Sequence, residues 1–246
     1  MAGRRASRDA ISREQWAGRI AAAAPAPGGA RAPRRAGDPL SAERIVDAAL
    51  AIVETSGFDD LTMRAVAAAL DTGPASLYAH VRSKAELGDL LIGRLSAGIR
   101  IPPPDPERWR EQFADVCAQL RDRFLRYPGV ARAALAVVPA DLATLKVADG
   151  MLGILLAGGV PARSAAWVTD AAVLYITAYC LEAAIAVQQS RDVDGEAISR
   201  DEISERLRML PGADFPNTVA LAEELTSGTG HERFEFTLGT MLRGLG

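Results

Sequence analysis

The sequence predicts an all-α protein, with an N-terminal three-helix helix-turn-helix domain followed by a C-terminal helical bundle. Apolar residues recur every three or four positions through most of residues 41–245, which is the period of helices with one buried face. No segment shows the alternation of apolar and polar residues that a half-buried strand requires. Breaks rich in proline and glycine separate the helical segments, and the proline-rich run at 102–106 divides the chain into two parts.

The composition is that of a globular protein with one large or two small domains. Of the 246 residues, 49% are hydrophobic and 24% are charged. The net charge of −3 argues against a nucleic-acid binder that is basic over its whole surface. The two cysteines, Cys117 and Cys180, lie in apolar helical segments. We therefore expect buried, unreactive thiols without a disulfide framework, as in a cytoplasmic protein.

Residues 1–38 form a basic segment rich in proline, glycine and alanine, with eight arginines against three acidic residues. A short helix around Trp16 and Ile20, at residues 12–24, fits the sequence, and the rest has the composition of a disordered linker. Two interpretations of this arm stay open: a floppy tail, or a basic segment that lies along DNA. Residues 39–99 and 105–246 are the two expected folded domains.

The first folded domain contains a helix-turn-helix pattern at residues 61–87. A buttressing helix, capped by Ser41, precedes it and ends near Gly57. We expect helices at about 62–70 and 74–81, joined by a short turn that contains Gly73. Ser83 and Glu86 then predict a capping box at the start of a helix that reaches about residue 99. In this layout the second helix of the pair enters the DNA major groove.

This stretch resembles the DNA-binding domain of the TetR family of bacterial transcriptional repressors. The matching residues are Leu61, Thr62, Arg64, Val66, Ala67, Leu70, Ser76, Leu77, Tyr78, His80, Val81, Lys84 and Leu87. The Leu-Tyr-x-His-Val-x-x-Lys run is the most specific part. The resemblance begins near Leu40 and extends, more loosely, to the C-terminus. It implies nine or ten helices, of which three form the DNA-binding domain and the fourth connects it to the rest.

The resemblance also implies which residues contact DNA. Thr62 and Arg64 would bind at the start of the first helix of the pair, and Tyr78, His80 and Lys84 would hold phosphates. The expected DNA-binding residues are Thr62, Arg64, Gly73, Pro74, Ala75, Ser76, Tyr78, His80 and Lys84. Among them Arg64 is the best candidate for a guanine contact, and Ser76 would reach a phosphate or a base edge.

The recognition helix departs from the family pattern in ways that reduce base reading. Pro74-Ala75 stands where tetracycline-binding members have a glutamine followed by proline, so only apolar contacts to thymine methyl groups are expected there. Ala79 replaces a tryptophan that supports backbone contact in those members. Residues 39–95 carry five cations against eight acidic residues, although Arg64, Arg82 and Lys84 face only Asp71 within residues 62–84.

The C-terminal part predicts helices at about 105–127, 130–137, 139–157, 161–190, 199–210, 219–225 and 230–245. The segment at 161–190 is long enough to span a bilayer, but Asp170 and Glu182 make that costly. A helix that is apolar all round is more simply buried on both sides, against its own core and against a partner subunit. We therefore expect no membrane association.

The family resemblance implies a ligand pocket and a dimer interface in these C-terminal helices. The candidate pocket residues are Phe113, Phe124, Tyr127, Met151, Leu155, Trp167, Leu174, Tyr175 and Tyr179. Ordinary core packing is the alternative for each of them. No histidine occurs between Arg82 and Gly230, so the metal-assisted tetracycline binding of some family members is not expected, and neither is a metal or cofactor.

The chain lacks the residue patterns of an enzyme. Its two histidines are His80 and His231, which cannot supply a multi-histidine metal site, and no glycine-rich phosphate loop is present. We expect a homodimeric repressor that binds double-stranded DNA at a palindromic operator and is released by a small apolar effector. The dimer would form through the helices near 161–190 and 230–245. The alternative is an all-α small-molecule- or lipid-binding protein, or an enzyme, that uses the C-terminal cavity without DNA.

Overall fold

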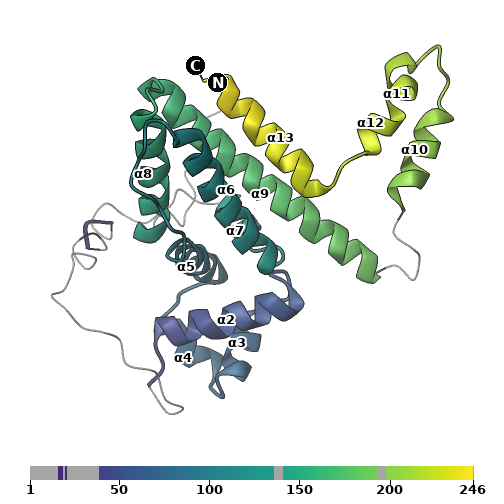
Figure 1. Cartoon of the computed structure of the whole chain (residues 1–246). Helices are drawn as coiled ribbons and strands as arrows, with labels where there is room; N and C mark the ends of the chain where they lie inside the picture. Colours follow the sequence, from purple (N-terminus) through teal and green to yellow (C-terminus); the bar gives the residue numbers. More distant parts are fainter. Residues whose placement is uncertain (1–15, 19, 21–38, 136–140, 193–197, 246) are drawn as a thin grey trace, which may run out of the picture. The chain divides into compact units, whose positions relative to one another are not determined.

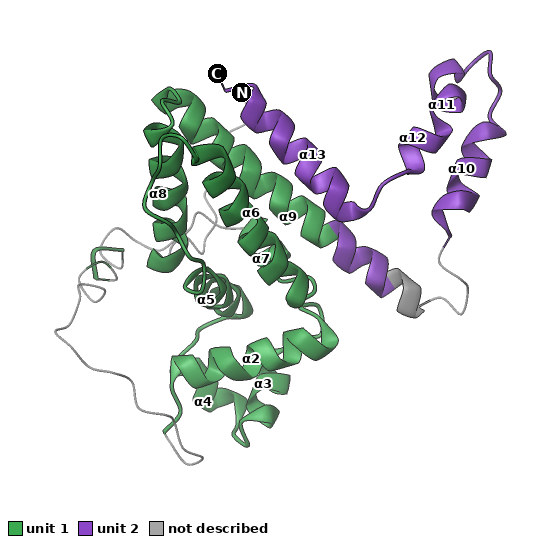
Figure 2. Cartoon of the chain, in the orientation of Figure 1, with its two compact units in different colours: residues 1–181 green, residues 182–246 purple. Residues whose placement is uncertain are grey.

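A computed structural model gives the fold for residues 16–18, 20, 39–135, 141–192 and 198–245. All regular secondary structure in these ranges is helical, which confirms the all-α prediction for the described residues (Figure 1). The expected N-terminal arm lies almost entirely outside them, although residues 16–18 and 20, within the expected short helix, are helical. The chain forms two compact units, Met1–Leu181 and Glu182–Gly246 (Figure 2).

Four short helices open the first unit. They are α2 (Ala42–Ser56), α3 (Met63–Ala69), α4 (Pro74–Tyr78) and α5 (Lys84–Ser96). Ser41 caps α2 as expected, since its hydroxyl accepts a hydrogen bond from Arg44 N at 3.3 Å. Helices α2, α3, α4 and α5 share one small core that is shielded from water. Its buried members are Ile45, Ala49, Val53, Leu61, Val66, Leu77, Val81, Leu87 and Leu91.

The helix that begins after Ser83 is capped differently from the expected box. Ser83 Oγ does accept from Glu86 N at 3.1 Å. The carboxylate of Glu86, however, accepts from Arg82 N at 2.7 Å and also binds the Arg82 guanidinium, whose pKa is raised by that hydrogen bond and charge. The Glu86 carboxylate therefore accepts from the backbone N–H of Arg82, the residue before the cap, and not from that of Ser83 as a capping box requires.

The remaining helices of the first unit are α6 (Trp109–Arg126), α7 (Ala131–Leu135), α8 (Leu142–Ala157) and the first part of α9 (Ala162–Asp192). On α9, Ala165, Ala172 and Ile176 are buried while Trp167 is 63% exposed. One face of α9 thus packs in the core and the other meets solvent. By length and a mean hydropathy of 1.6, residues 162–188 also meet the criteria for a membrane-spanning helix.

The second unit holds the end of α9 and four further helices: α10 (Arg200–Arg208), α11 (Pro216–Ala220), α12 (Ala222–Thr226) and α13 (Gly230–Arg243). The expected capping box at α13 is present. Glu232 N donates to Thr229 Oγ1 at 3.2 Å, and Thr229 N donates to Glu232 Oε2 at 2.6 Å. These hydrogen bonds lower the pKa of Glu232, because they favour its charged form.

Close packing at the end of α8 gives a prediction about stability. Gly158 has φ −74, so its backbone does not require glycine, but a Cβ there would overlap the ring of buried Trp109. Gly158→Ala should therefore lower the free energy of unfolding by about 1–3 kcal/mol. Gly153→Ala, inside α8, is the control, since its Cβ would lie an ordinary 3.7 Å from Pro104 Cγ. Denaturant titration should find the control neutral or about 0.5–1 kcal/mol more stable; equal losses would contradict this packing.

Candidate nucleic-acid interface and ligand cavity

The turn between α3 and α4 is held by backbone groups. Thr62 caps α3 by accepting from Ala65 N at 3.0 Å, and Thr72 N closes the other end by donating to Ala67 O at 3.0 Å. Asp71 adopts a positive φ of 51, a conformation that aspartate tolerates better than most residues. Gly73 then precedes Pro74 at the first turn of α4, where proline loses no hydrogen bond.

All nine expected DNA-binding residues are exposed. Helix α4 ends at Tyr78 rather than near residue 81, and a turn follows in which His80 N donates to Leu77 O at 2.9 Å. The side chains of Leu77 and Val81 are fully buried and anchor this segment. Tyr78 stands 50% exposed beside them. The helix-turn-helix thus exposes hydroxyl, imidazole and small side chains to solvent, and DNA contact by these residues stays a prediction.

The three cations of this surface differ in the groups that they contact. Lys84 Nζ lies 3.4 Å from Asp59 O and 5.1 Å from the centre of the Phe58 ring. Arg82 pairs with Glu86 at 3.2 Å. Arg64 is exposed on α3 and makes no hydrogen bond or ion pair with the residues that the structure describes. Its guanidinium is therefore available for a ligand outside the chain.

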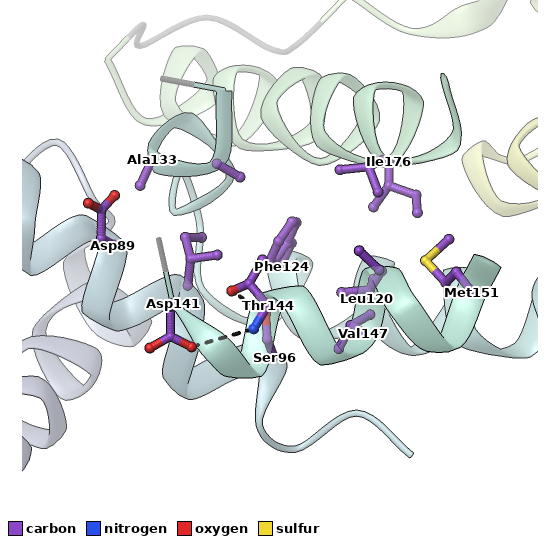
Figure 3. Close-up of a pocket in the computed structure, with 14 residues that line it drawn as sticks. Asp89, Ser96, Leu120, Phe124, Ala133, Asp141, Thr144, Val147, Met151 and Ile176 are labelled. Carbon is purple, nitrogen blue, oxygen red and sulfur yellow. Dashed lines mark hydrogen bonds between the residues drawn. The ribbon is translucent and has the colours of Figure 1, made fainter. Parts of the chain in front are cut away.

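An apolar cavity of about 120 Å³ lies within the first unit, among α5, α6, α7, α8 and α9. It is lined by Asp89, Ile92, Ser96, Leu120, Phe124, Ala133, Ala134, Asp141, Thr144, Val147, Ala148, Met151, Val173 and Ile176. Four of these residues are polar, and two of them are joined, because Thr144 Oγ1 donates to Ser96 Oγ at 3.2 Å (Figure 3). Asp141 caps α8 by accepting from Ala143 N at 2.8 Å.

Two of the nine expected pocket residues, Phe124 and Met151, line this cavity. The other seven do not: Phe113 and Leu155 are fully buried, Tyr127, Tyr175 and Tyr179 are half-buried, and Trp167 and Leu174 are more than half exposed. Burial raises the pKa of Tyr179. Sequence reasoning missed the polar lining because it followed aromatic residues. A short polar side chain on the apolar face of a helix, such as Ser96 or Thr144, is the sequence feature that could have indicated this lining.

A buried junction, formed by Phe58, Gly88 and Ala133, joins the cavity to the helix-turn-helix. Phe58, in the loop after α2, is 8% exposed, and its backbone N donates to Pro128 O at 2.9 Å. A Cβ on Gly88 of α5 would lie 3.6 Å from the Phe58 ring and 3.1 Å from Ala133 Cβ. Ala133 also lines the cavity, and its neighbour Arg132 pairs with Asp59 at 2.8 Å. The wall of the cavity and the loop that supports α3 are therefore in direct contact.

An exposed helix-turn-helix joined through a packed junction to an apolar cavity defines a ligand-responsive, DNA-binding transcriptional regulator. The chain belongs to the TetR family of such regulators. Residues 45–89 match the family model of bacterial regulatory proteins of the tetR family, and residues 102–246 match that of the tetracyclin repressor-like C-terminal domain. These proteins regulate transcription and are not enzymes. The use of the cavity without DNA is accordingly not favoured.

Similar proteins extend along most of the chain. The apo structure of ActR from Streptomyces coelicolor is 35% identical, covers 85% of this chain and 96% of its own, and has a TM-score of 0.76. ActR has also been crystallised in complex with actinorhodin. An HTH-type transcriptional regulator of Saccharopolyspora erythraea is 29% identical over 81% of each chain. The class G tetracycline repressor of Vibrio anguillarum is 26% identical, over 81% of this chain and 90% of its own.

Proposed function

We propose that the protein is a homodimeric repressor that leaves a palindromic operator when a small, mainly apolar molecule fills its cavity. Residues 39–99 bind DNA, and residues 105–246 form the dimer and, together with Asp89, Ile92 and Ser96 of α5, the effector cavity. The position of Ala133 supports this proposal, because Ala133 lines the cavity and also packs against Gly88 of α5, beside the Phe58 ring. The protein acts in the cytoplasm, as DNA-binding regulators of this family generally do.

DNA affinity and DNA sequence preference come from different residues in this proposal. Tyr78 and His80 bind phosphates, which fix orientation without reading sequence. Arg64 reads a guanine, because its unengaged guanidinium can donate two hydrogen bonds to one base. The net-acidic domain keeps binding to unrelated DNA weak, and the basic arm at 1–38 adds attraction for the backbone.

Release from DNA follows from a cavity that changes size. Helix α5 contributes Asp89, Ile92 and Ser96 to the cavity wall, while its Gly88 contacts the junction. A molecule that binds the expanded cavity more tightly than the contracted one shifts the population toward the expanded state. That expansion moves α5 and α7 against Phe58 and alters the position of α3 and α4. DNA affinity falls by the ratio of the two effector affinities, typically 5–150-fold in allosteric proteins.

The dimer interface is the exposed face of α9 together with α13. Trp167, Ala171, Leu174 and Ala178 are exposed at spacings of four, three and four residues, which is the pattern of a helix that packs along another helix. Trp167 and Leu174 expose 63% and 51% of their surface in the single chain. On α13, Phe236 exposes 69%. Two copies related by a two-fold axis would bury these side chains against each other.

Leu174→Glu tests this interface. A carboxylate in the middle of the apolar seam would have to be desolvated on association, so we expect the variant to be monomeric at micromolar concentration. Sedimentation velocity measures the change, and operator affinity should fall with it because two half-sites are no longer bound together. Leu156→Glu, at a position on α8 that is 50% exposed, is the control and should stay dimeric. A monomeric wild-type chain, or a dimeric Leu174→Glu variant, would refute the interface.

A further inference from the structure

The turn between α6 and α7 docks on the loop between α2 and α3. The turn comprises residues 126–132, and the loop comprises residues 54–59, which include the end of α2. Three contacts join the two segments in the same order along each: Arg126 to Glu54 at 3.0 Å, Phe58 N to Pro128 O at 2.9 Å, and Arg132 to Asp59 at 2.8 Å. We call this set of three contacts the clasp.

The backbones of the turn and the loop approach each other closely at the clasp. Gly57 and Gly129 both have a positive φ, of 91° and 79°, which glycine adopts without strain. A Cβ on Gly129 would lie only 3.3 Å from Phe58 Cβ, and a Cβ on Gly57 would lie 3.7 Å from Pro128 O. Val130 is fully buried and anchors the turn in the core. We therefore expect the turn and the loop to move together.

Each side of the clasp leads to a functional part of the chain. Phe124 and Ala133, which flank the turn in the sequence, line the cavity. On the other side, Asp59 O accepts a hydrogen bond from Lys84 Nζ at 3.4 Å, and that ammonium lies 5.1 Å from the centre of the Phe58 ring. The clasp therefore connects the cavity wall to a lysine that is expected to hold a DNA phosphate.

We infer that Arg126 and Arg132 are positioning residues for DNA binding, because they hold the turn on the loop and so set the position of α3 and Lys84. Helix α3 begins shortly after the loop ends, so a shift of the loop is passed to the start of α3. This route runs from α6 and α7 directly to the loop, beside the one through Gly88 of α5. Its part in release by an effector rests on the proposed function.

The ion pairs of the clasp are strong enough to bias this position without deciding whether the chain folds. All four of their side chains are exposed. An exposed pair changes an equilibrium by about fivefold or less. Loss of one pair should therefore leave the melting temperature within about 4 °C of the wild type.

Neutralising the two members of one pair tests the inference, because the two changes in charge are opposite. Arg126→Gln removes a cation and Glu54→Gln removes an anion, so a general effect of charge would weaken DNA binding in the first variant and strengthen it in the second. Fluorescence anisotropy measures the affinity for a selected operator duplex and for an unrelated duplex. We expect both variants to lower the ratio of these affinities by about two- to fivefold. A ratio that Glu54→Gln leaves unchanged or raises would overturn the inference.

Exchanging the two charges tests the pair itself. Glu54→Arg combined with Arg126→Glu keeps the net charge and can re-form the pair, so the ratio should return to within about twofold of the wild type. Arg108→Gln is the control, since it breaks an exposed pair with Glu111, 3.1 Å away near the start of α6, and should leave the ratio unchanged. A purely structural loss would not be rescued by the exchange.

The second ion pair gives an independent test. Asp59→Asn and Arg132→Gln should each lower the ratio by the same two- to fivefold, on the order expected for an exposed pair. If the wild type prefers its operator and the loss of either pair leaves that preference intact, the clasp does not position the DNA-binding helices and the proposed function stands. A wild-type chain that prefers no duplex would instead contradict the proposed function, and the inference with it.

Discussion

Replacing Arg64 with alanine is expected to weaken operator binding by about ten- to a hundredfold, a loss of about 1–3 kcal/mol. The guanidinium is exposed and has no partner among the described residues, so its removal takes nothing from the folded chain. The melting temperature should therefore stay within a degree or two of the wild type. Fluorescence anisotropy with a labelled operator duplex measures the affinity.

The pattern of the loss distinguishes a base contact from a phosphate contact. If Arg64 reads a guanine, the variant should lose its preference at one position of each half-site and retain its affinity for unrelated DNA. Lys146→Ala removes an exposed cation from α8 and is the control for a general change in charge. An Arg64→Ala variant with unchanged affinity and unchanged preference would show that α3 has been assigned the wrong role.

Filling the cavity from within should release DNA without any effector. Ala148 lines the cavity on α8, and Ala148→Phe places a ring where the effector binds. We expect operator affinity to fall about 5–150-fold, the usual range of allosteric coupling. Lys146→Phe adds the same ring at an exposed position of the same helix and should leave the affinity unchanged. A properly folded Ala148→Phe variant with wild-type affinity would contradict the coupling.

A double-mutant cycle tests whether that effect passes through the junction. Phe58→Leu keeps an apolar side chain in the loop but loses the ring that lies near Gly88 and beneath the Lys84 ammonium. In this background the effect of Ala148→Phe on operator affinity should be smaller by at least about threefold, since contacting residues on one path are not additive. If the two substitutions change operator affinity additively, Phe58 does not transmit the effect of Ala148→Phe to the DNA-binding helices.

The helix-turn-helix could be predicted from the sequence because its determinants are local. Thr62 caps α3, Gly73 and Pro74 start α4, and Leu77 and Val81 are buried one helical turn apart. Each of these features depends on residues within four positions of one another. The helical spacing predicts that α4 ends near Val81, three residues beyond its observed end at Tyr78, because the turn at Ala79 and His80 keeps the same spacing.

The cavity could not be predicted in the same way, because five separate helices contribute to it. Helical spacing identifies which side chains face inward but not which of them meet across the bundle. Leu155 of α8 is buried in packed core, whereas Leu174, an apolar residue of α9, is more than half exposed. The junction could not be predicted from the sequence either. It depends on the lack of a side chain at Gly88 and on a hydrogen bond to the backbone oxygen of Pro128, and neither leaves a pattern of side chains.

Two copies of the helix-turn-helix are expected to read one palindromic site. Selection of binding sites from random duplexes, followed by affinity measurements at increasing salt, tests this expectation. We expect an inverted repeat whose half-site centres lie about 34–36 Å apart, one turn of DNA, bound by two chains. We also expect an affinity that falls steeply with salt, because phosphate contacts release counterions. Recovery of no preferred duplex at ~50 mM salt, where such contacts are strongest, would contradict this expectation.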